Sequence, residues 1–186
     1  MQPLAILFAL WYTDFMKYNY KTLYEKNASF YKESPARISW LKLFNTALTW
    51  VFAVAYAALW LYAVKSDKFP LRDLVSVFFA PALALILVSV LRLGIERPRP
   101  YSENGANITP LVPKKDRDGD SFPSRHIACA AAIAMVFLSV LPIFGVLLAL
   151  CCLGLAYTRF SIGVHYPSDL AAGFAVGILC GVTVFI

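Results

Sequence analysis

Charged residues are scarce in this 186-residue chain, at 15% of the sequence against roughly 25% in an average soluble domain. Apolar residues make up 60%. This scarcity of charge excludes a disordered chain, a coiled coil and a basic nucleic-acid-binding arm, and a soluble core of this size would need more polar surface. We therefore expect a membrane protein with no nucleic-acid partner, built as a single domain over residues 1–186.

Four long windows contain no charge at all: Leu43–Val64, Leu74–Leu91, Ile127–Thr158 and Leu170–Ile186. A transmembrane helix needs about 20 mainly apolar residues, so the first, second and fourth windows each predict one. The third window would be about 48 Å long as one helix, against a hydrocarbon core of about 30 Å. Because Pro142 offers a break, we expect two spans there, at 122–141 and 143–162. The prediction is an all-α membrane bundle with five transmembrane helices.

The N-terminal segment, residues 1–38, supports two interpretations. Its apolar stretch from Pro3 to Thr13 is only 11 residues long and is followed by Asp14 and Lys17. Residues 15–37 then mix aromatic side chains with lysine and arginine, which is typical of a helix lying in the membrane interface. The segment is therefore either an interfacial helix or a short sixth crossing.

The sequence offers no convincing metal or cofactor site. The four cysteines lie inside apolar windows, where small buried hydrophobic residues are expected, and none has metal-ligand spacing with histidine. They are Cys129, Cys151, Cys152 and Cys180. The long polar loop at 94–122 contains Asp116, Asp118 and Asp120 but lacks the downstream glutamate of a calcium loop. We expect a solvated turn there, and neither a metal nor a cofactor.

Six ionisable residues stand at the edges of the apolar windows, and they include both histidines of the chain. They are Arg92, Arg99, His126, Arg159, His165 and Asp169. Ionisable groups at membrane depth are costly and usually functional, although a single arginine can simply anchor a helix end. If the chain turns back at Pro142, all six lie on the same side of the bundle.

Arginine, histidine and carboxylate together favour phosphoryl chemistry. Guanidinium groups bind phosphate oxygens through paired hydrogen bonds and neutralise charge on a phosphoryl group in transfer. One histidine can act as nucleophile with a carboxylate orienting it, and a second can protonate the leaving oxygen. Ser124 and the backbone N–H groups after Pro123 would open a helix, and helix N-termini bind anions.

Three stretches resemble the motifs of the type 2 phosphatidic acid phosphatase (PAP2) superfamily. The first runs from Arg92 to Arg99 and Pro100 as a basic residue, six others and Arg-Pro. The second is Pro-Ser-Arg-His at 123–126, where the family usually has Pro-Ser-Gly-His. The third runs from Thr158-Arg159 through His165 to Asp169, where the family usually opens with Ser-Arg. Order and internal spacing all match.

The resemblance implies a role for each residue. His165 would attack phosphorus, Asp169 would orient it, and His126 would be the general acid. The phosphate ligands would be Arg92, Arg99, Ser124, Arg159 and, less directly, Arg125. Arg125 stands in place of the usual glycine and could reach a second phosphate, the substrate headgroup or solvent. The extra pair Arg97-Pro98 is expected only to shape the turn.

The function expected from this resemblance is metal-independent hydrolysis of a lipid phosphate or diphosphate entering from the bilayer. Candidate substrates are phosphatidic acid, phosphatidylglycerol phosphate and a polyprenyl diphosphate. A phosphotransferase using the same phosphohistidine, and a non-catalytic transporter of anionic lipid, are the alternatives. The family's usual placement implies a multi-pass protein of the cell membrane with an extracytoplasmic site, although the basic N-terminal segment opposes that orientation.

Glycines recur every four residues in the last window, at Gly173, Gly177 and Gly181. Small residues at this spacing allow two helices to approach closely. The stripe predicts either packing inside the bundle or a homodimer contact.

Overall fold

The structure is a computed structural model that describes residues 19–66, 71–113 and 121–183. The apolar stretch at 3–13, the aspartates at 116–120 and the last three residues of the fifth predicted span lie outside these ranges. A first helix occupies residues 19–32 and is followed by the five helices of the bundle. These are α2 (Pro35–Lys65), α3 (Leu71–Ile95), α4 (Arg125–Val140), α5 (Pro142–Ile162) and α6 (Pro167–Val182).

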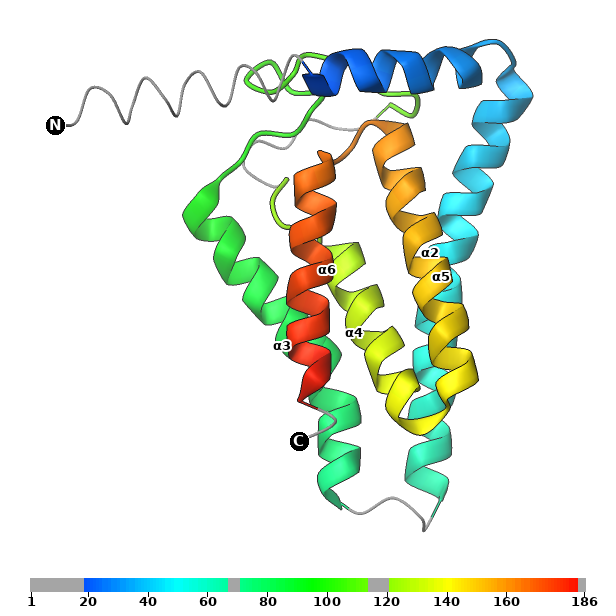
Figure 1. Cartoon of the computed structure of the whole chain (residues 1–186), viewed down its shortest axis with the longest axis vertical. Coiled ribbons are helices and arrows are strands. Elements are labelled where there is room, and N and C mark those ends of the chain that lie inside the picture. The colour runs from blue at the N-terminus through cyan, green and yellow to red at the C-terminus, as the bar shows by residue number, and fades with distance from the viewer. Residues whose placement is uncertain (1–18, 67–70, 114–120, 184–186) are drawn as a thin grey trace, which may run out of the picture.

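Each of the five predicted spans corresponds to one helix of the bundle, and the chain turns back where expected. Leu141 separates α4 from α5, and Pro142 occupies the first turn of α5. Proline suits that position because its missing N–H would have no helical partner there, whereas inside one continuous helix it would remove a hydrogen bond. The long apolar window is therefore a helical hairpin (Figure 1).

The helices differ from the predicted spans in their lengths. Three of them, α2, α3 and α5, are long and apolar enough to cross a membrane. The other two, α4 and α6, have 16 residues each, or about 24 Å at 1.5 Å per residue. The prediction started the last span at Leu170 because Asp169 is charged, but α6 begins at Pro167 and includes Asp169 in its first turn. An acidic residue at that position accepts hydrogen bonds from the helix start, so a charge-free window misses it.

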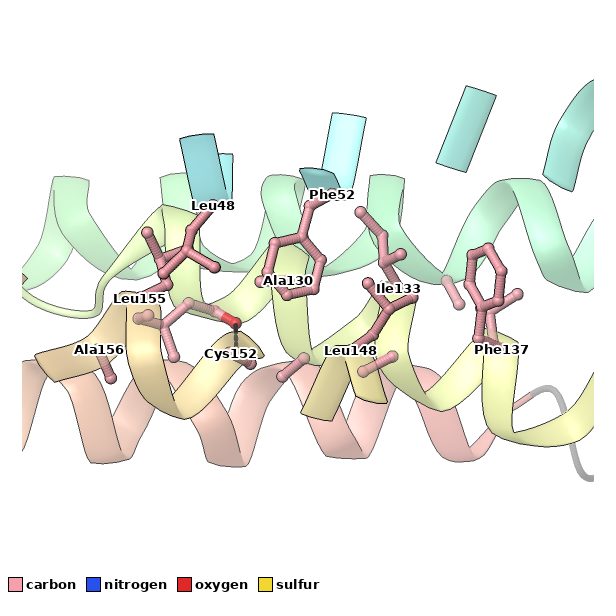
Figure 2. Packing of buried hydrophobic residues seen from close by; sticks show 14 of the residues in the cluster. Leu48, Phe52, Ala130, Ile133, Phe137, Leu148, Cys152, Leu155 and Ala156 are labelled. Carbon is pink, nitrogen blue, oxygen red and sulfur yellow. Dashed lines mark hydrogen bonds between the residues drawn. The ribbon is translucent and has the colours of Figure 1, made fainter. Parts of the chain in front are cut away.

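The apolar core lies between α2, α4 and α5 (Figure 2). Phe52 of α2 is buried beside Ala130 and Ile133 of α4, and Leu155 of α5 is 1% exposed in the same cluster. Leu48 lies one helical turn before Phe52 and extends the same face of α2. The small residues of α4 let neighbouring helices approach it, so α4 forms the centre of the bundle.

The glycine stripe of α6 packs against α4 within the same chain. A Cβ atom at Gly177 would lie 2.4 Å from the carbonyl oxygen of Ala128, and one at Gly181 would lie 2.3 Å from Cβ of Met135. At Gly173 the nearest atom would be the carbonyl oxygen of Ser124, at 2.8 Å. The stripe therefore serves intrachain packing. The alternative of a homodimer through these glycines is not supported, because α4 already covers that face.

The helix at 19–32 lies across one end of the bundle and not alongside it (Figure 1). It is anchored by Tyr24, whose hydroxyl donates to the carbonyl oxygen of Thr109 at 2.9 Å and accepts from the N–H of Leu111 at 3.1 Å. Tyr20 and Tyr24 are buried against the loop that follows α3 and the link between α5 and α6. For its described part, the N-terminal segment has the orientation that the interfacial interpretation predicts.

Candidate active site

All the candidate residues lie at the same end of the bundle, beneath the helix at 19–32 (Figure 1). Arg92 is in the last turn of α3, and Arg159 is in the last turn of α5. Ser124 precedes α4, while Asp169 is in the first turn of α6. Antiparallel packing makes these helix ends neighbours, so residues far apart in the sequence face the same space.

His165 lies in the short link between α5 and α6 and is 2% exposed. Its Nδ1 atom is 3.6 Å from Oδ2 of Asp169 and has no hydrogen-bond partner within 3.5 Å among the described residues. Such contacts are often long before substrate binds and shorten in the reacting complex. Because Nδ1 is directed at the carboxylate, the other ring nitrogen, Nε2, is left for chemistry.

Gly163 ends α5 in a left-handed conformation and sets the direction of this link. Its φ is +89°, which favours glycine, and a Cβ atom there would lie 2.9 Å from both Tyr24 and Ile108. The next N–H, that of Val164, bonds back to the carbonyl oxygen of Arg159 at 3.2 Å. The tight reversal places His165 two residues beyond Gly163 and directs it inward.

Asp169 is fully buried and bonded on both carboxylate oxygens. Its Oδ1 accepts from Nη1 of Arg97 at 2.7 Å. Its Oδ2 accepts from the hydroxyl of Ser121 at 2.5 Å and from the N–H of Tyr166 at 2.9 Å. A buried carboxylate needs such partners, because an uncompensated charge out of water is strongly unfavourable.

Arg97 corrects the expectation that the pair Arg97-Pro98 only shapes the turn. Besides Asp169, its Nη1 atom donates to the hydroxyl of Ser168 at 2.7 Å. Its guanidinium carbon is 4.2 Å from the centre of the Tyr166 ring. The sequence feature that could have indicated a role for Arg97 is the presence of three arginines within eight residues, Arg92, Arg97 and Arg99. Ser121 was missed as well, because a serine before a phenylalanine-proline pair has no distinctive pattern of its own.

The arginines of the expected phosphate site have different surroundings. Nε and Nη2 of Arg92 both donate to the carbonyl oxygen of Pro123, at 2.9 and 2.7 Å. Arg99 donates from Nη1 to the carbonyl oxygen of Val164 at 3.2 Å. Arg159 has a buried Nε atom without a hydrogen-bond partner among the described residues. Arg92 therefore holds the turn before α4, whereas Arg99 and Arg159 flank the link that carries His165.

Ser124 and His126 border the same space from the start of α4. The hydroxyl of Ser124 is buried and finds no hydrogen-bond partner among the described residues, and it does not cap the helix. The backbone N–H of Ser124 donates to the carbonyl oxygen of Asp169 at 3.0 Å, which ties α4 to α6. His126 is exposed and lies within electrostatic reach of His165 and Arg159.

A groove of about 410 Å³ leads from this end of the bundle down the surface between α2, α3 and α4. Its polar end carries Arg125 and His126, while the remaining wall is mainly apolar, with Phe52, Leu85 and Ile133 among its residues. The side chain of Arg125 has no hydrogen bond or ion pair to the described residues and faces this groove. The arrangement fits an amphipathic molecule with an anionic head and a hydrocarbon chain.

His165 is held in its neutral form. Burial, assisted by the positive charges of Arg99 and Arg159 and opposed by Asp169, lowers the pKa of His165 to about 4. A neutral imidazole is the form that can act as a nucleophile or base. The same two arginines that lower the pKa carry the charge that would attract a phosphate.

The fold and site together define a helical membrane protein with a buried histidine–carboxylate pair flanked by arginines at one end of the bundle. The sequence profile of the PAP2 superfamily matches residues 73–186, so the chain belongs to that superfamily. This region contains all the proposed site residues and leaves the helix at 19–32 and α2 outside the match.

Two curated relatives are lipid A 1-phosphatases of rhizobia. The protein of Rhizobium johnstonii is 32% identical over 101 residues, which cover 54% of this chain and 41% of the relative. That of Rhizobium etli is 32% identical over 93 residues, covering 50% of this chain and 40% of the relative. The chain thus matches about two fifths of the length of these relatives.

Two crystal structures share the fold over most of their length. LpxE of Aquifex aeolicus superposes with a TM-score of 0.63 at 26% identity, covering 82% of this chain and 87% of that one. The first transmembrane PAP2-type phosphatidylglycerolphosphate phosphatase of Bacillus subtilis superposes with a TM-score of 0.59 at 18% identity, covering 95% and 92%. The second likeness is one of fold alone.

Proposed function

We propose that this protein is a membrane phosphatase that hydrolyses a lipid phosphate or diphosphate through a phosphohistidine on His165. The observation that carries the proposal is the setting of His165. It is buried, it directs Nδ1 toward Asp169 at 3.6 Å, and it lies beside Arg99 and Arg159 at one end of the bundle. A nucleophile, an orienting carboxylate and cations for phosphate are the parts that phosphoryl transfer requires.

The reaction has two displacements at phosphorus. In the first, the lone pair of His165 Nε2 forms a P–N bond while the P–O bond to the lipid alcohol breaks, and His126 protonates the departing oxygen. Asp169 stabilises the cationic imidazole through Nδ1. In the second, water attacks phosphorus, the P–N bond breaks, and His126 accepts a proton from the water. The products are inorganic phosphate and the lipid alcohol, or inorganic phosphate and the lipid monophosphate when the substrate is a diphosphate.

The remaining polar groups bind the phosphoryl oxygens in this proposal. The unpartnered Ser124 hydroxyl and Arg159 Nε are buried donors placed to bind an anion. Arg99 adds charge beside the His165 link, and Arg92 acts by its charge and by fixing the turn before Ser124. Donors of this kind in a water-poor site stabilise the charge that develops in the transition state.

The groove at Arg125 supports a lipid as the substrate. A hydrocarbon chain would lie against the apolar wall, with its phosphate toward His126 and the site. Arg125 would then contact a second anionic or oxygen-rich group of the lipid head, since its side chain faces the groove. Phosphatidic acid, phosphatidylglycerol phosphate, a polyprenyl diphosphate and the 1-phosphate of lipid A are the candidates to compare.

Phosphate release by the purified protein in detergent tests the proposal. A panel of the four candidate lipids without an added acceptor should give inorganic phosphate from at least one, and His165→Ala should give none. Release only when a lipid or sugar acceptor is present would indicate a phosphotransferase. Lipid transport by a His165→Ala variant without any phosphate release from the normal protein would instead indicate a transporter.

We further propose that the site faces the extracytoplasmic side of the cell membrane, as the family resemblance implies. Lys21, Lys26 and Lys32 lie on the helix at the same end, which runs against the usual preference of basic residues for the cytoplasm. Glu103 is exposed in the loop at this end, so a Glu103→Cys variant can report on orientation. A membrane-impermeant maleimide should label that variant in intact cells above the background of the unchanged protein, and labelling only after lysis would place the site in the cytoplasm.

A further inference from the structure

Asp169 receives more hydrogen bonds than orientation of one imidazole requires. Oδ2 faces His165 Nδ1 at 3.6 Å and already accepts from Ser121 and the N–H of Tyr166. Oδ1 accepts from Arg97 at 2.7 Å. The two oxygens therefore have separate tasks, because the cation binds the one that faces away from the histidine.

The guanidinium of Arg97 is itself held in place by Ser168 and Tyr166 as well as by Asp169. The hydroxyl of Ser168 lies 2.7 Å from Nη1, and the ring of Tyr166 lies 4.2 Å from the guanidinium carbon. Cations over aromatic rings are stabilised further when they are partly desolvated, and the Arg97 side chain is only 27% exposed. Arg97 thus serves the carboxylate, whereas Arg99 and Arg159 act on His165.

We propose that Arg97 and Ser121 are positioning residues that keep Asp169 charged and oriented toward His165. The inference rests on the proposed function and deepens it. Arg97 balances the buried charge through Oδ1, and Ser121 fixes the carboxylate plane through Oδ2. Oδ2 is then in place to accept a hydrogen bond from Nδ1–H when the P–N bond forms and the imidazole becomes cationic. Mutation of a residue that hydrogen-bonds to the group orienting a reactive side chain typically lowers activity by 10- to 100-fold.

Steady-state kinetics of four variants test the inference. Arg97→Met should lower kcat about 100-fold and change KM by less than about threefold, because substrate contacts remain. Arg97→Lys keeps a cation near Oδ1 and should recover to within about tenfold of the normal kcat. Ser121→Ala should lower kcat about tenfold. Arg37→Met is the matched control, since Arg37 also pairs with a carboxylate, Glu33, and lies 4.2 Å from an aromatic ring, yet contacts no proposed site residue.

Two further measurements separate positioning from phosphate binding and from a merely structural role. Inhibition by inorganic phosphate should be unchanged in Arg97→Met, because this guanidinium is bonded to Asp169. In an Asp169→Asn background, adding Arg97→Met should lower kcat by less than twofold, since residues acting through the same group are not additive. Added guanidinium ion should restore part of the kcat of Arg97→Met and none of the kcat of Ser121→Ala.

The outcomes that overturn the inference are distinct from failure of the proposed function. A kcat near normal in folded Arg97→Met, a raised KM with unchanged kcat, or full additivity with Asp169→Asn each overturn it. If Arg97→Met does not fold, the inference is tested with Arg97→Lys and Ser121→Ala, and a normal kcat in both variants overturns the inference. Absence of phosphate release from the unchanged protein on every lipid of the panel overturns the proposed function and this inference together.

Discussion

The polar end of the bundle and its apolar middle are built on opposite principles. At the polar end, Arg97, Ser121 and Asp169 come from separate segments and are held by hydrogen bonds whose distances and charges matter. In the middle, α4 and α6 pack through glycine and alanine, with no polar bond between the side chains at their contact among the described residues. Charge and orientation decide the first region and volume decides the second, so the same kind of substitution should have different consequences in each.

The largest effect should come from the polar end, with loss of His165, the proposed nucleophile. We expect His165→Ala to lower phosphate release at least about 10⁴-fold, because no other group forms the P–N bond. Thermal unfolding in detergent should change little, since the imidazole Nδ1 forms no hydrogen bond shorter than 3.5 Å with the described residues. Measurable turnover near the normal rate would contradict the proposed mechanism.

Removal of Arg159, which is proposed to bind the phosphate, should have the next largest effect. Arg159→Met is expected to lower kcat/KM by about 10²- to 10³-fold, the size found for a single group that stabilises transition-state charge. Inhibition by inorganic phosphate should weaken in parallel, unlike in Arg97→Met. Equal phosphate inhibition in the two variants would show that the division of tasks between the arginines is wrong.

A larger side chain in the apolar middle of the bundle should lower stability and leave kcat nearly unchanged. Gly177→Ala places a Cβ atom 2.4 Å from the carbonyl oxygen of Ala128, so α4 and α6 must move apart. We expect the free energy of unfolding to fall by about 1–3 kcal/mol, the usual range for overpacking. Gly94→Ala is the matched control, because nothing lies within 4 Å of the added atom. A large loss of kcat in folded Gly177→Ala would contradict the separation between the two regions.

A smaller effect should appear in the pH dependence. The positive charge of Arg99 lowers the pKa of His165, so Arg99→Gln should raise that pKa. His165 would then become protonated, and inactive as a nucleophile, at a higher pH than in the unchanged protein. The acid limb of kcat/KM should therefore move toward neutral pH. A limb that stays in place or moves to lower pH would show that another group controls it.

The smallest expected effect is that of a chelator. In the proposed mechanism Arg92, Arg99 and Arg159 provide the positive charge that phosphoryl transfer needs, so EDTA should leave phosphate release unchanged. The measurement is the initial rate before and after prolonged chelation, with re-addition of divalent cations as the control. Loss of activity that Mg²⁺ restores would overturn the metal-independent mechanism.

The helices were predictable from the sequence to different degrees. Charge-free windows located all five, and Pro142 located the reversal between α4 and α5, because proline and charge act locally. The predicted start of α6 was wrong because the Asp169 side chain lies in the first turn and caps the helix, whereas the prediction treated its charge as a helix boundary. The glycine stripe did not show which helix packs against it, since a surface of small residues suits a helix of the same chain and a helix of a second copy equally well.

For the site, motif spacing predicted which residues lie near one another, and the structure places them together at one end of the bundle. Motif spacing could not show that Arg97, Arg99 and Arg159 have different partners, because all three carry the same charge in similar polar surroundings. Only the tertiary structure shows that Arg97 hydrogen-bonds to Asp169 and that Arg159 Nε has no partner among the described residues. The physical reason is that a side chain's composition sets its charge, whereas a hydrogen bond also requires a partner within about 3 Å, and helix packing alone decides that distance.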